Sequence, residues 1–292
     1  MTYLFQGIVT GMAYSLAAVG VVIIFNVVRA FQFAQGAVVM FAAYIFAEFY
    51  LSFHWNLALS LLMLIAAMVV FSFAISPLIF EPLLGRPFPS LIGSLGILLV
   101  LTEVVGRYFF SGQAVAYPET LKPDGAFELG GTSFSYRELL VLGCAIVGVG
   151  LLDVFFHHSR AGIQMRALAD TRIGAQICGI HTKRHIRLGF VVAGLAAALG
   201  GLLLGMLLSN ISPDLGNDLT FKAVAAVLVA GSTSFRGAIL ASLIIGVAES
   251  LAVGYFQPTY SSAVAYVVIV VVLLFRPNGL FEAPVEHEAE TA

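Results

Sequence analysis

The sequence predicts an all-α, polytopic bundle of transmembrane helices, with eight clear spans and one short or re-entrant segment. Of its 292 residues, 60% are hydrophobic and only 10% are charged, whereas about a quarter of an ordinary soluble domain is charged. Several apolar runs reach the ~20 residues that a helix needs to cross a bilayer. The runs are continuous and do not alternate with polar residues, so a transmembrane β-barrel is excluded.

The apolar runs give the predicted spans in chain order. The eight long ones cover residues 4–28, 34–53, 57–80, 91–110, 139–156, 188–209, 237–256 and 260–275. A ninth run, 219–230, has about a dozen residues, which is short for a full span and suits a re-entrant or broken helix. We expect residues 1–281 to form a single transmembrane domain, followed by an acidic tail at 282–292.

The distribution of Lys and Arg predicts the orientation. The loop 157–187 holds six Lys or Arg residues against one acid, Asp170, and basic loops stay in the cytoplasm. Alternation from this loop places Arg29, Arg86 and Arg276 inside and the acid-rich loop 111–138 outside. Arg236 lies inside only if the run 219–230 crosses the membrane. The nine-crossing arrangement is therefore favoured, with the N-terminus outside and the tail in the cytoplasm.

The basic loop also has a helical pattern. Apolar residues recur at helical spacing at Met165, Leu168, Ala169, Ile173, Ile177 and Ile180. Arg166 and Asp170 are four residues apart and can pair across one turn, and Gly179 is suited to end the helix. The pattern predicts one amphipathic helix over 160–180. It fits either a helix that contacts a partner or an ordinary basic helix resting on lipid headgroups.

Five motifs follow one another along nearly the whole chain. The basic loop carries Gly162, Arg166-Ala167, Asp170, Ala175 and Gly179-Ile180. The others are Phe33-Ala34-Gln35-Gly36 with Met40 and Ala43-Tyr44, then Ile92-Gly93-Ser94-Leu95-Gly96, the turn from Gly231 to Ala238, and Arg276-Pro277-Asn278-Gly279-Leu280-Phe281. In this order they resemble the branched-chain amino acid permease family of ABC importers.

The resemblance implies a function and a set of partners. In such importers the permease binds no nucleotide, and this sequence has no GxxxxGK[ST] phosphate loop. ATP is bound by two partner ATPase subunits, which push on a coupling helix. The implied coupling residues are Gly162, Arg166, Ala167, Asp170, Ala175 and Gly179. A second permease chain, homologous or identical, and an extracytoplasmic solute-binding protein complete the expected assembly, in the plasma membrane of a bacterium or archaeon.

Two residues of the first motif differ from the family pattern, and these differences leave the identity of the solute open. The family has His and Glu where this chain has Gln35 and Ala37. A branched-chain or related amino acid is the leading expectation for the solute, and urea, short amides and small carboxylates remain open. No nucleic acid, metal or cofactor is expected in this chain.

Polar residues within spans mark candidate positions of the solute pathway, because they are costly in lipid. They are Asn26, Gln35, Glu48, Ser94, Glu103, Asn210 and Glu249. Gln35 and Ser94 rank first because they adjoin glycines that can open the backbone, and Glu249 follows because it is deep in its span. Each also has a structural explanation: Glu48, Glu103 and Asn210 lie near span ends, and Glu249 can act as an internal anchor.

Three other functions were considered. A proton-coupled secondary transporter would use Glu103 and Glu249. An intramembrane protease would need a histidine beside a buried serine, or an HExxH zinc motif, and no histidine lies within a predicted span. A passive channel is disfavoured by the loop that resembles a coupling helix.

Overall fold

Seven helical segments are long and apolar enough to span a membrane in the part of the chain that the structure describes. The computed structural model describes residues 2–118, 125–129, 132–208 and 210–255, with 263, 266, 267, 270–272, 274, 276, 279 and 280. The segments are α1 (Thr2–Val28), α2 (Gln35–Ala47, extended to Ser52 by a π-helical turn), α3 (Leu57–Ile75, extended to Phe80 likewise), α4 (Pro87–Tyr108), α5 (Tyr136–His158), α8 (Thr182–Leu208) and α10 (Phe235–Tyr255).

These segments confirm seven of the eight predicted long spans. The eighth, 260–275, lies largely outside the described residues, and the tail 282–292 lies wholly outside them.

Local signals explain the starts of two helices. The side chain of Asn56 accepts a hydrogen bond from the backbone N of Leu59 at 2.9 Å, the usual contact of an N-cap residue. Pro87 occupies the first position of α4, where its missing N–H costs nothing.

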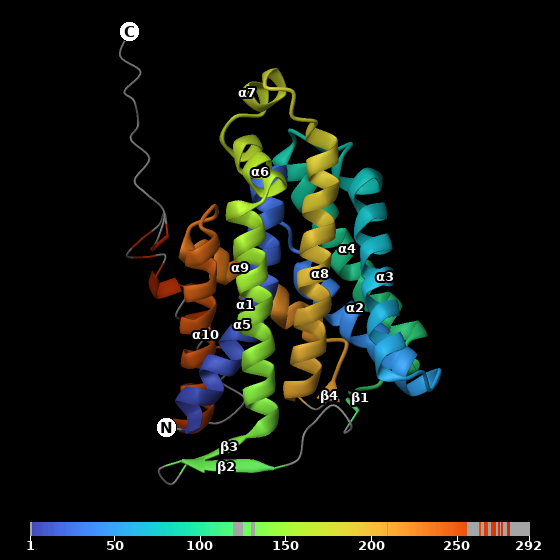
Figure 1. Ribbon diagram of the computed structural model, residues 1–292, viewed down its shortest axis with the longest axis vertical. Coiled ribbons are helices and arrows are strands. Elements are labelled where there is room, and N and C mark those ends of the chain that lie inside the picture. The colour runs from blue at the N-terminus through green and yellow to red at the C-terminus, as the bar shows by residue number, and fades with distance from the viewer. Residues whose placement is uncertain are drawn as a thin grey trace.

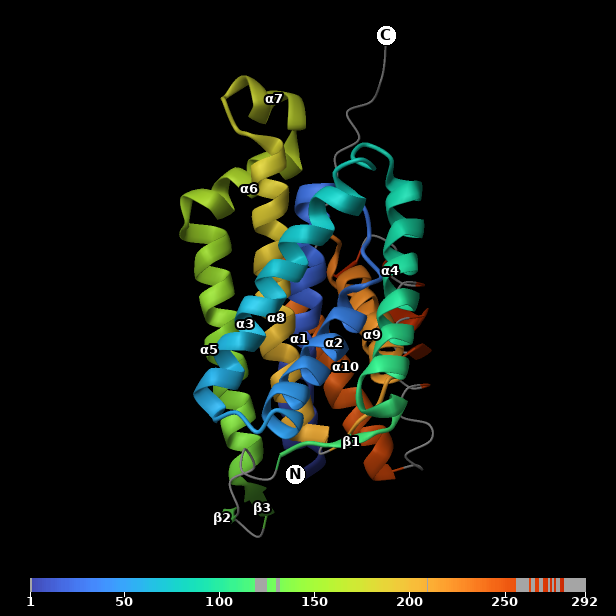
Figure 2. The same ribbon diagram turned by 90° about the vertical axis from the view of Figure 1, so that its right-hand side faces the viewer.

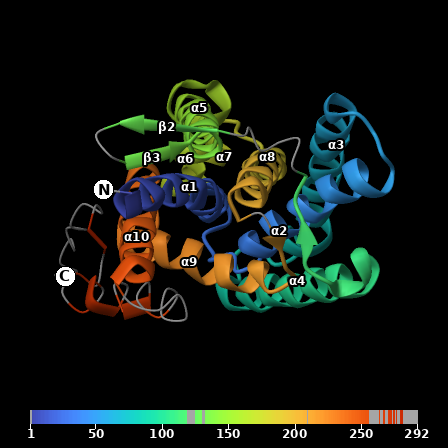
Figure 3. The ribbon, with the colours of Figure 1, turned by 90° about the horizontal axis from the view of Figure 1, so that it is seen from below.

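Helix α1 is the centre of the bundle and packs against α5, α8, α9 (Leu215–Ala230) and α10, as the end-on view shows (Figure 3). Its approach to α10 is close because glycines line the contact. A Cβ on Gly7 would lie 2.6 Å from Val247 Cα, and one on Gly11 would lie 2.8 Å from Leu243 Cα. Small residues allow such approach of two backbones in membranes. Helix α3 is the least buried of the seven spans, since only 22% of the residues in its most apolar stretch are buried inside the bundle.

The end of the bundle that holds the N-terminus also carries four short strands (Figure 1). Strand β1 (Val115–Ala116) pairs antiparallel with β4 (Asn210–Ile211), and β2 (Ala126–Leu129) pairs antiparallel with β3 (Thr132–Ser135). Helix α9 follows β4 directly. Its 16 residues rise ~24 Å, less than the ~30 Å hydrocarbon layer, as expected for the short ninth run.

The opposite end carries α6 (Arg160–Asp170) and α7 (Arg172–Ile177) (Figures 1 and 2). Arg236, in the first turn of α10, pairs there with Asp153 near the end of α5, with two N–O distances of 3.2 Å. Because β4 is at one end and the start of α10 lies toward the other, α9 runs along the bundle between them. The nine-crossing arrangement requires this course.

Candidate functional site

A tight turn joins α5 to α6. The side chain of Ser159 accepts a hydrogen bond from the backbone N of Gly162 at 3.0 Å and so caps α6. A Cβ on Gly162 would lie 2.4 Å from the carbonyl oxygens of both Phe155 and Phe156. Only glycine therefore allows α6 to leave α5 at this angle, which gives a physical role to the first residue of the loop motif.

Helix α6 is attached to two spans. Met165, Leu168 and Ala169 are buried, as the apolar stripe predicted. Arg166 Nη2 donates to the carbonyl oxygen of His157 in the last turn of α5 at 3.1 Å. Gln164 Oε1 lies 2.7 Å from Nε2 of His185 in α8. A displacement of α6 must therefore displace α5 and α8.

The prediction of one continuous helix over 160–180 is wrong. The backbone of Thr171 is extended, with φ −143° and ψ 116°, and separates α6 from α7. The break turns Arg172 toward α1, where its Nη2 donates to the carbonyl oxygens of Val27 at 3.2 Å and Val28 at 2.7 Å. These are end-of-helix carbonyls that lack partners within the helix. The predicted Arg166–Asp170 pair does not form, because Arg166 binds the α5 carbonyl and Asp170 is exposed.

Helix α7 lies at the tip of the bundle (Figure 1), and part of its apolar surface is exposed. Ala175 is buried, but Ile173 is 75% exposed and Ile177 is 82% exposed. The predicted apolar stripe is therefore split, with its α6 half covered and these two isoleucines uncovered. Gly179 ends the helix as predicted, with φ +80°, and the backbone N of Ile180 bonds to the Ala175 carbonyl at 3.0 Å, the pattern of a Schellman motif. We call residues 160–180 the α6–α7 element.

Gln35 and Ser94 each make a hydrogen bond at or next to the start of α2, where residues 29–34 enter the bundle without helical structure. The backbone N of Phe33 donates to Ser94 Oγ at 3.1 Å. Gln35 Nε2 donates to the carbonyl oxygen of Ala193 in α8 at 3.0 Å. Both side chains are fully buried. A Cβ on Gly36 would lie 2.1 Å from the backbone N of Thr220, so the start of α2 lies directly against α9.

The sequence analysis missed a buried cation, Lys222. Its ammonium group lies 2.6 Å from Asp218 Oδ2 and 2.7 Å from Glu249 Oε1, and its side chain is 2% exposed. It also donates to the hydroxyl of Tyr14 at 3.3 Å. The network links α9 to α10 and α1. The sequence feature that could have revealed this network is the i, i+4 spacing of Asp218 and Lys222 at the short apolar run.

Glu249 also lines a cavity of about 270 Å³ near the N-terminal end. The cavity is shared with Gln6, Tyr14 and Glu138, and Gln6 Nε2 donates to Glu138 Oε1 at 3.2 Å. Glu249 thus borders a cavity, whereas the side chains of Gln35 and Ser94 are buried.

The remaining polar candidates sit apart from both clusters. Glu103 forms an exposed ion pair with Arg107 on α4. Asn26 Nδ2 donates to the Val22 carbonyl of its own helix at 2.9 Å. Glu48 begins the π-helical turn after α2, and Asn210 is an exposed residue of β4.

Residues 3–273 match a family model described as "Branched-chain amino acid transport system / permease component". The chain belongs to the branched-chain amino acid transport permease family. It is 30% identical to the permease protein BraD of Pseudomonas aeruginosa over 96% of this chain and 95% of that one. It is 28% identical to the permease protein LivH of Escherichia coli K12 over the same shares. Among solved structures it resembles PsaBC from Streptococcus pneumoniae in complex with Fab, with a TM-score of 0.49 and 12% identity over 95% of this chain and 93% of that one.

Membership of the branched-chain amino acid transport permease family decides between the functions that the sequence left open. The chain is a multi-pass membrane permease component of an ABC importer and is not itself an enzyme. The proton-coupled alternative is therefore set aside. Its two acids, Glu103 and Glu249, are each paired with a cation.

Gly162 offers a direct test of how the α6–α7 element is held. Gly162→Ala should displace α6, because the new Cβ collides with two backbone carbonyls, and overpacking of this kind costs about 1–3 kcal/mol. Gly150→Ala in α5 is the matched control, since nothing lies within 4 Å of its Cβ position. Thermal unfolding in detergent should show a lower midpoint for the first variant only. Equal midpoints would contradict the close contact at Gly162.

Proposed function

We propose that this chain translocates a branched-chain amino acid, or a closely related small solute, as the membrane subunit of an importer driven by partner ATPases. The family match over residues 3–273 supports the solute class. So do the two relatives, each described as part of a high-affinity branched-chain amino acid transport system. Gln35 and Ala37, which depart from the family pattern, keep urea, short amides and small carboxylates as alternatives.

The α6–α7 element is the observation that carries the ATPase-driven mechanism. It is bonded to α5 through Arg166, to α8 through Gln164 and to α1 through Arg172. Its outer surface presents Ile173 and Ile177 to whatever lies beyond the bundle end. Exposed apolar residues on a rigidly held element are typical of a protein contact. In this proposal two ATPase subunits bind ATP and dock on α7, and the α6–α7 element passes their movement to three spans.

The proposed pathway residues are Gln35, Ser94 and Glu249. A helix that starts inside the membrane offers backbone groups to a solute only where it is covered by protein, and α2 starts in such a place. Movement of α8 would break the bond from Gln35 to the Ala193 carbonyl and free the amide for a polar solute. Glu249 borders a cavity near the N-terminal end of the bundle and is the proposed residue of the entry side.

The rest of the assembly follows from the family and remains part of the proposal. It contains two ATP-binding subunits, a second homologous permease chain or a second copy of this one, and an extracytoplasmic solute-binding protein. The membrane is the plasma membrane of a bacterium or archaeon, with the α6–α7 end in the cytoplasm and the N-terminus outside. The basic residues of that end support this orientation.

The orientation predicts opposite accessibility at the two ends. A cysteine at Gly125, next to β2, should react with a membrane-impermeant maleimide added to intact cells. A cysteine at Thr182, at the start of α8, should react only after the membrane is opened. Both variants need the native exposed cysteines, Cys144 and Cys178, replaced by serine. The reverse labelling pattern would overturn the orientation.

Reconstitution tests the solute and the energy source together. Vesicles holding this chain with its co-purified subunits should accumulate radiolabelled leucine when the binding protein is outside and ATP is inside. Without ATP, or with a non-hydrolysable analogue, accumulation should stop. ATP-dependent uptake of a labelled amide or urea, with none of leucine, isoleucine or valine, would replace the solute and keep the mechanism.

A further inference from the structure

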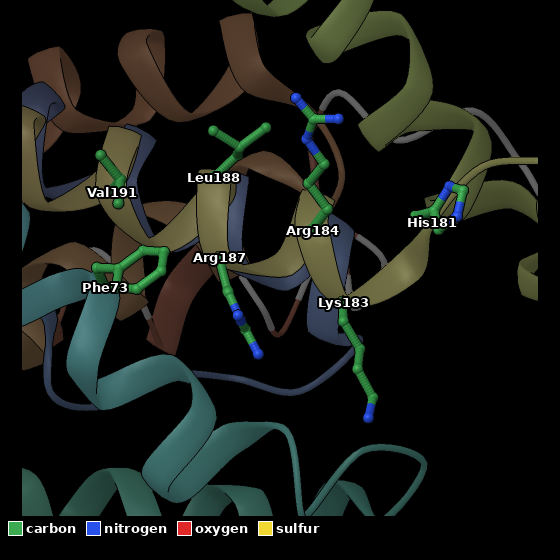
Figure 4. Close-up of a pocket in the computed structure, with 7 residues that line it drawn as sticks. All are labelled: Phe73, His181, Lys183, Arg184, Arg187, Leu188 and Val191. Carbon is green, nitrogen blue, oxygen red and sulfur yellow. The ribbon is translucent and has the colours of Figure 1, made fainter.

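A groove of about 440 Å³ runs between α3 and the first half of α8 at the α6–α7 end. Figure 4 shows its lining, with Lys183, Arg184 and His181 toward one end and Phe73, Leu188 and Val191 toward the other. Arg187 lies between these two groups. The groove is thus basic at one end and apolar at the other.

Arg187 forms part of one wall of the groove, and its guanidinium group is already paired with Glu81. Its Nε and Nη2 donate to Glu81 at 2.5 and 3.2 Å, and its guanidinium group lies 5.7 Å from the centre of the Phe73 ring. The hydrogen bonds from Arg187 hold the pKa of Glu81 below its ordinary value, so this carboxylate remains charged near neutral pH. The pair joins the end of α3 to α8 and fixes the shape of the groove.

Lys183 and Arg184 add positive charge to the groove beyond that of Arg187, and the charge of Lys183 also helps to lower the pKa of Glu81. Both side chains are exposed. Within the described residues, no hydrogen bond or ion pair occupies either one. Two cations beside a groove whose third cation is neutralised by Glu81 favour an anionic occupant.

The apolar part of the groove faces outward along the most exposed span. On α3, Val70, Phe73 and Leu78 are 68%, 51% and 73% exposed, as expected for side chains that contact lipid tails. Helix α8 has 27 residues and rises ~40 Å, close to the full thickness of a bilayer with its headgroups. Its first turn therefore lies at headgroup level, and Val191, ~10 Å further along the axis, lies at the level of the acyl chains.

We propose that this groove binds an anionic phospholipid of the leaflet on the α6–α7 side. Lys183 and Arg184 extend to opposite sides of α8 (Figure 4) and flank the headgroup, and the acyl chains lie over Phe73, Leu188 and Val191. Binding of a free phosphate would account for the cations but not for the apolar wall that faces outward. Basic pockets between spans on this side of a membrane are suited to lipid headgroups. The site is independent of the identity of the transported solute.

Binding to the purified chain in nanodiscs or detergent tests the site. We expect phosphatidylglycerol to bind more tightly than phosphatidylcholine by native mass spectrometry. The double variant Lys183→Ala/Arg184→Ala should lose about 25-fold in affinity for phosphatidylglycerol, because each cation near an anionic lipid contributes about a factor of five. Arg29→Ala/Arg86→Ala removes two exposed cations outside the groove and should bind as the parent does. Phe73→Ser should weaken both lipids.

Four outcomes with the purified chain would overturn the proposal. They are equal binding of the two lipids, an unchanged affinity in the Lys183/Arg184 variant, an equal loss in the Arg29/Arg86 variant, and full competition by millimolar inorganic phosphate, which would identify a free-anion site. Thermal unfolding midpoints equal to that of the parent show that the variants are folded. In the complete assembly, loss of the bound lipid together with protection of Lys183 and Arg184 from acylating or glyoxal reagents would assign the groove to an ATPase contact and also overturn the proposal.

Discussion

Lys222→Met should destabilise the protein more than Gly162→Ala does. The methionine leaves Glu249 without its counter-charge inside the bundle, and breaking a buried ion pair by removing one partner costs about 3–5 kcal/mol. The lysine side chain is 2% exposed, and its ammonium lies 2.7 Å from Glu249. We expect a large fall in the amount of monodisperse protein extracted from membranes and a much lower unfolding midpoint.

A second substitution and a matched control separate charge from packing in this network. Lys222→Met combined with Glu249→Gln removes both buried charges and should recover much of the lost stability. Arg236→Met breaks an ion pair whose arginine side chain is 69% exposed, and such pairs contribute about 1 kcal/mol or less. If Lys222→Met and Arg236→Met unfold at the same temperature, the buried network has no special role in holding α9 to α10.

Ile173→Asp/Ile177→Asp should abolish ATP-driven uptake while leaving the permease folded. The two side chains are 75% and 82% exposed, so the bundle loses little when they become charged. An ATPase docked on α7 loses two apolar contacts and must bury two carboxylates, and central contacts of an interface each contribute about 2 kcal/mol or more. The ATPase subunits should therefore no longer co-purify, and uptake in reconstituted vesicles should fall to background.

The conservative pair Ile173→Leu/Ile177→Leu keeps the apolar surface and should retain both uptake and co-purification. Normal uptake by the aspartate variant would show that α7 is not the docking surface. An unfolding midpoint well below that of the parent would show that the isoleucines are covered within the permease itself, against their exposure in the structure.

The spans were predictable because length and apolarity alone define them. A run of about 20 apolar residues has few alternatives to a membrane helix, and seven such runs recur as helices with ends near those expected. The glycine that ends α7 was equally predictable, since φ +80° at Gly179 is a conformation that other residues rarely adopt.

The functional details depended on tertiary contacts that the sequence pattern does not contain. Helical spacing grouped Met165 with Ile173 and Ile177, yet the break at Thr171 covers the first and exposes the other two. That break is stabilised by Arg172, whose partners in α1 are 144 and 145 residues away. The role of Lys222 could not be predicted for a related reason, because its partner in α10, Glu249, is 27 residues further along the chain.

In the proposed mechanism this permease works through ATPase subunits that dock on the α6–α7 element. The most direct measurement is purification of the tagged chain from native membranes in mild detergent, with identification of the proteins that accompany it. We expect two ATP-binding subunits and a second permease chain, all lost or weakened in the Ile173→Asp/Ile177→Asp variant. A chain that purifies alone and transports solute into vesicles without ATP would contradict it.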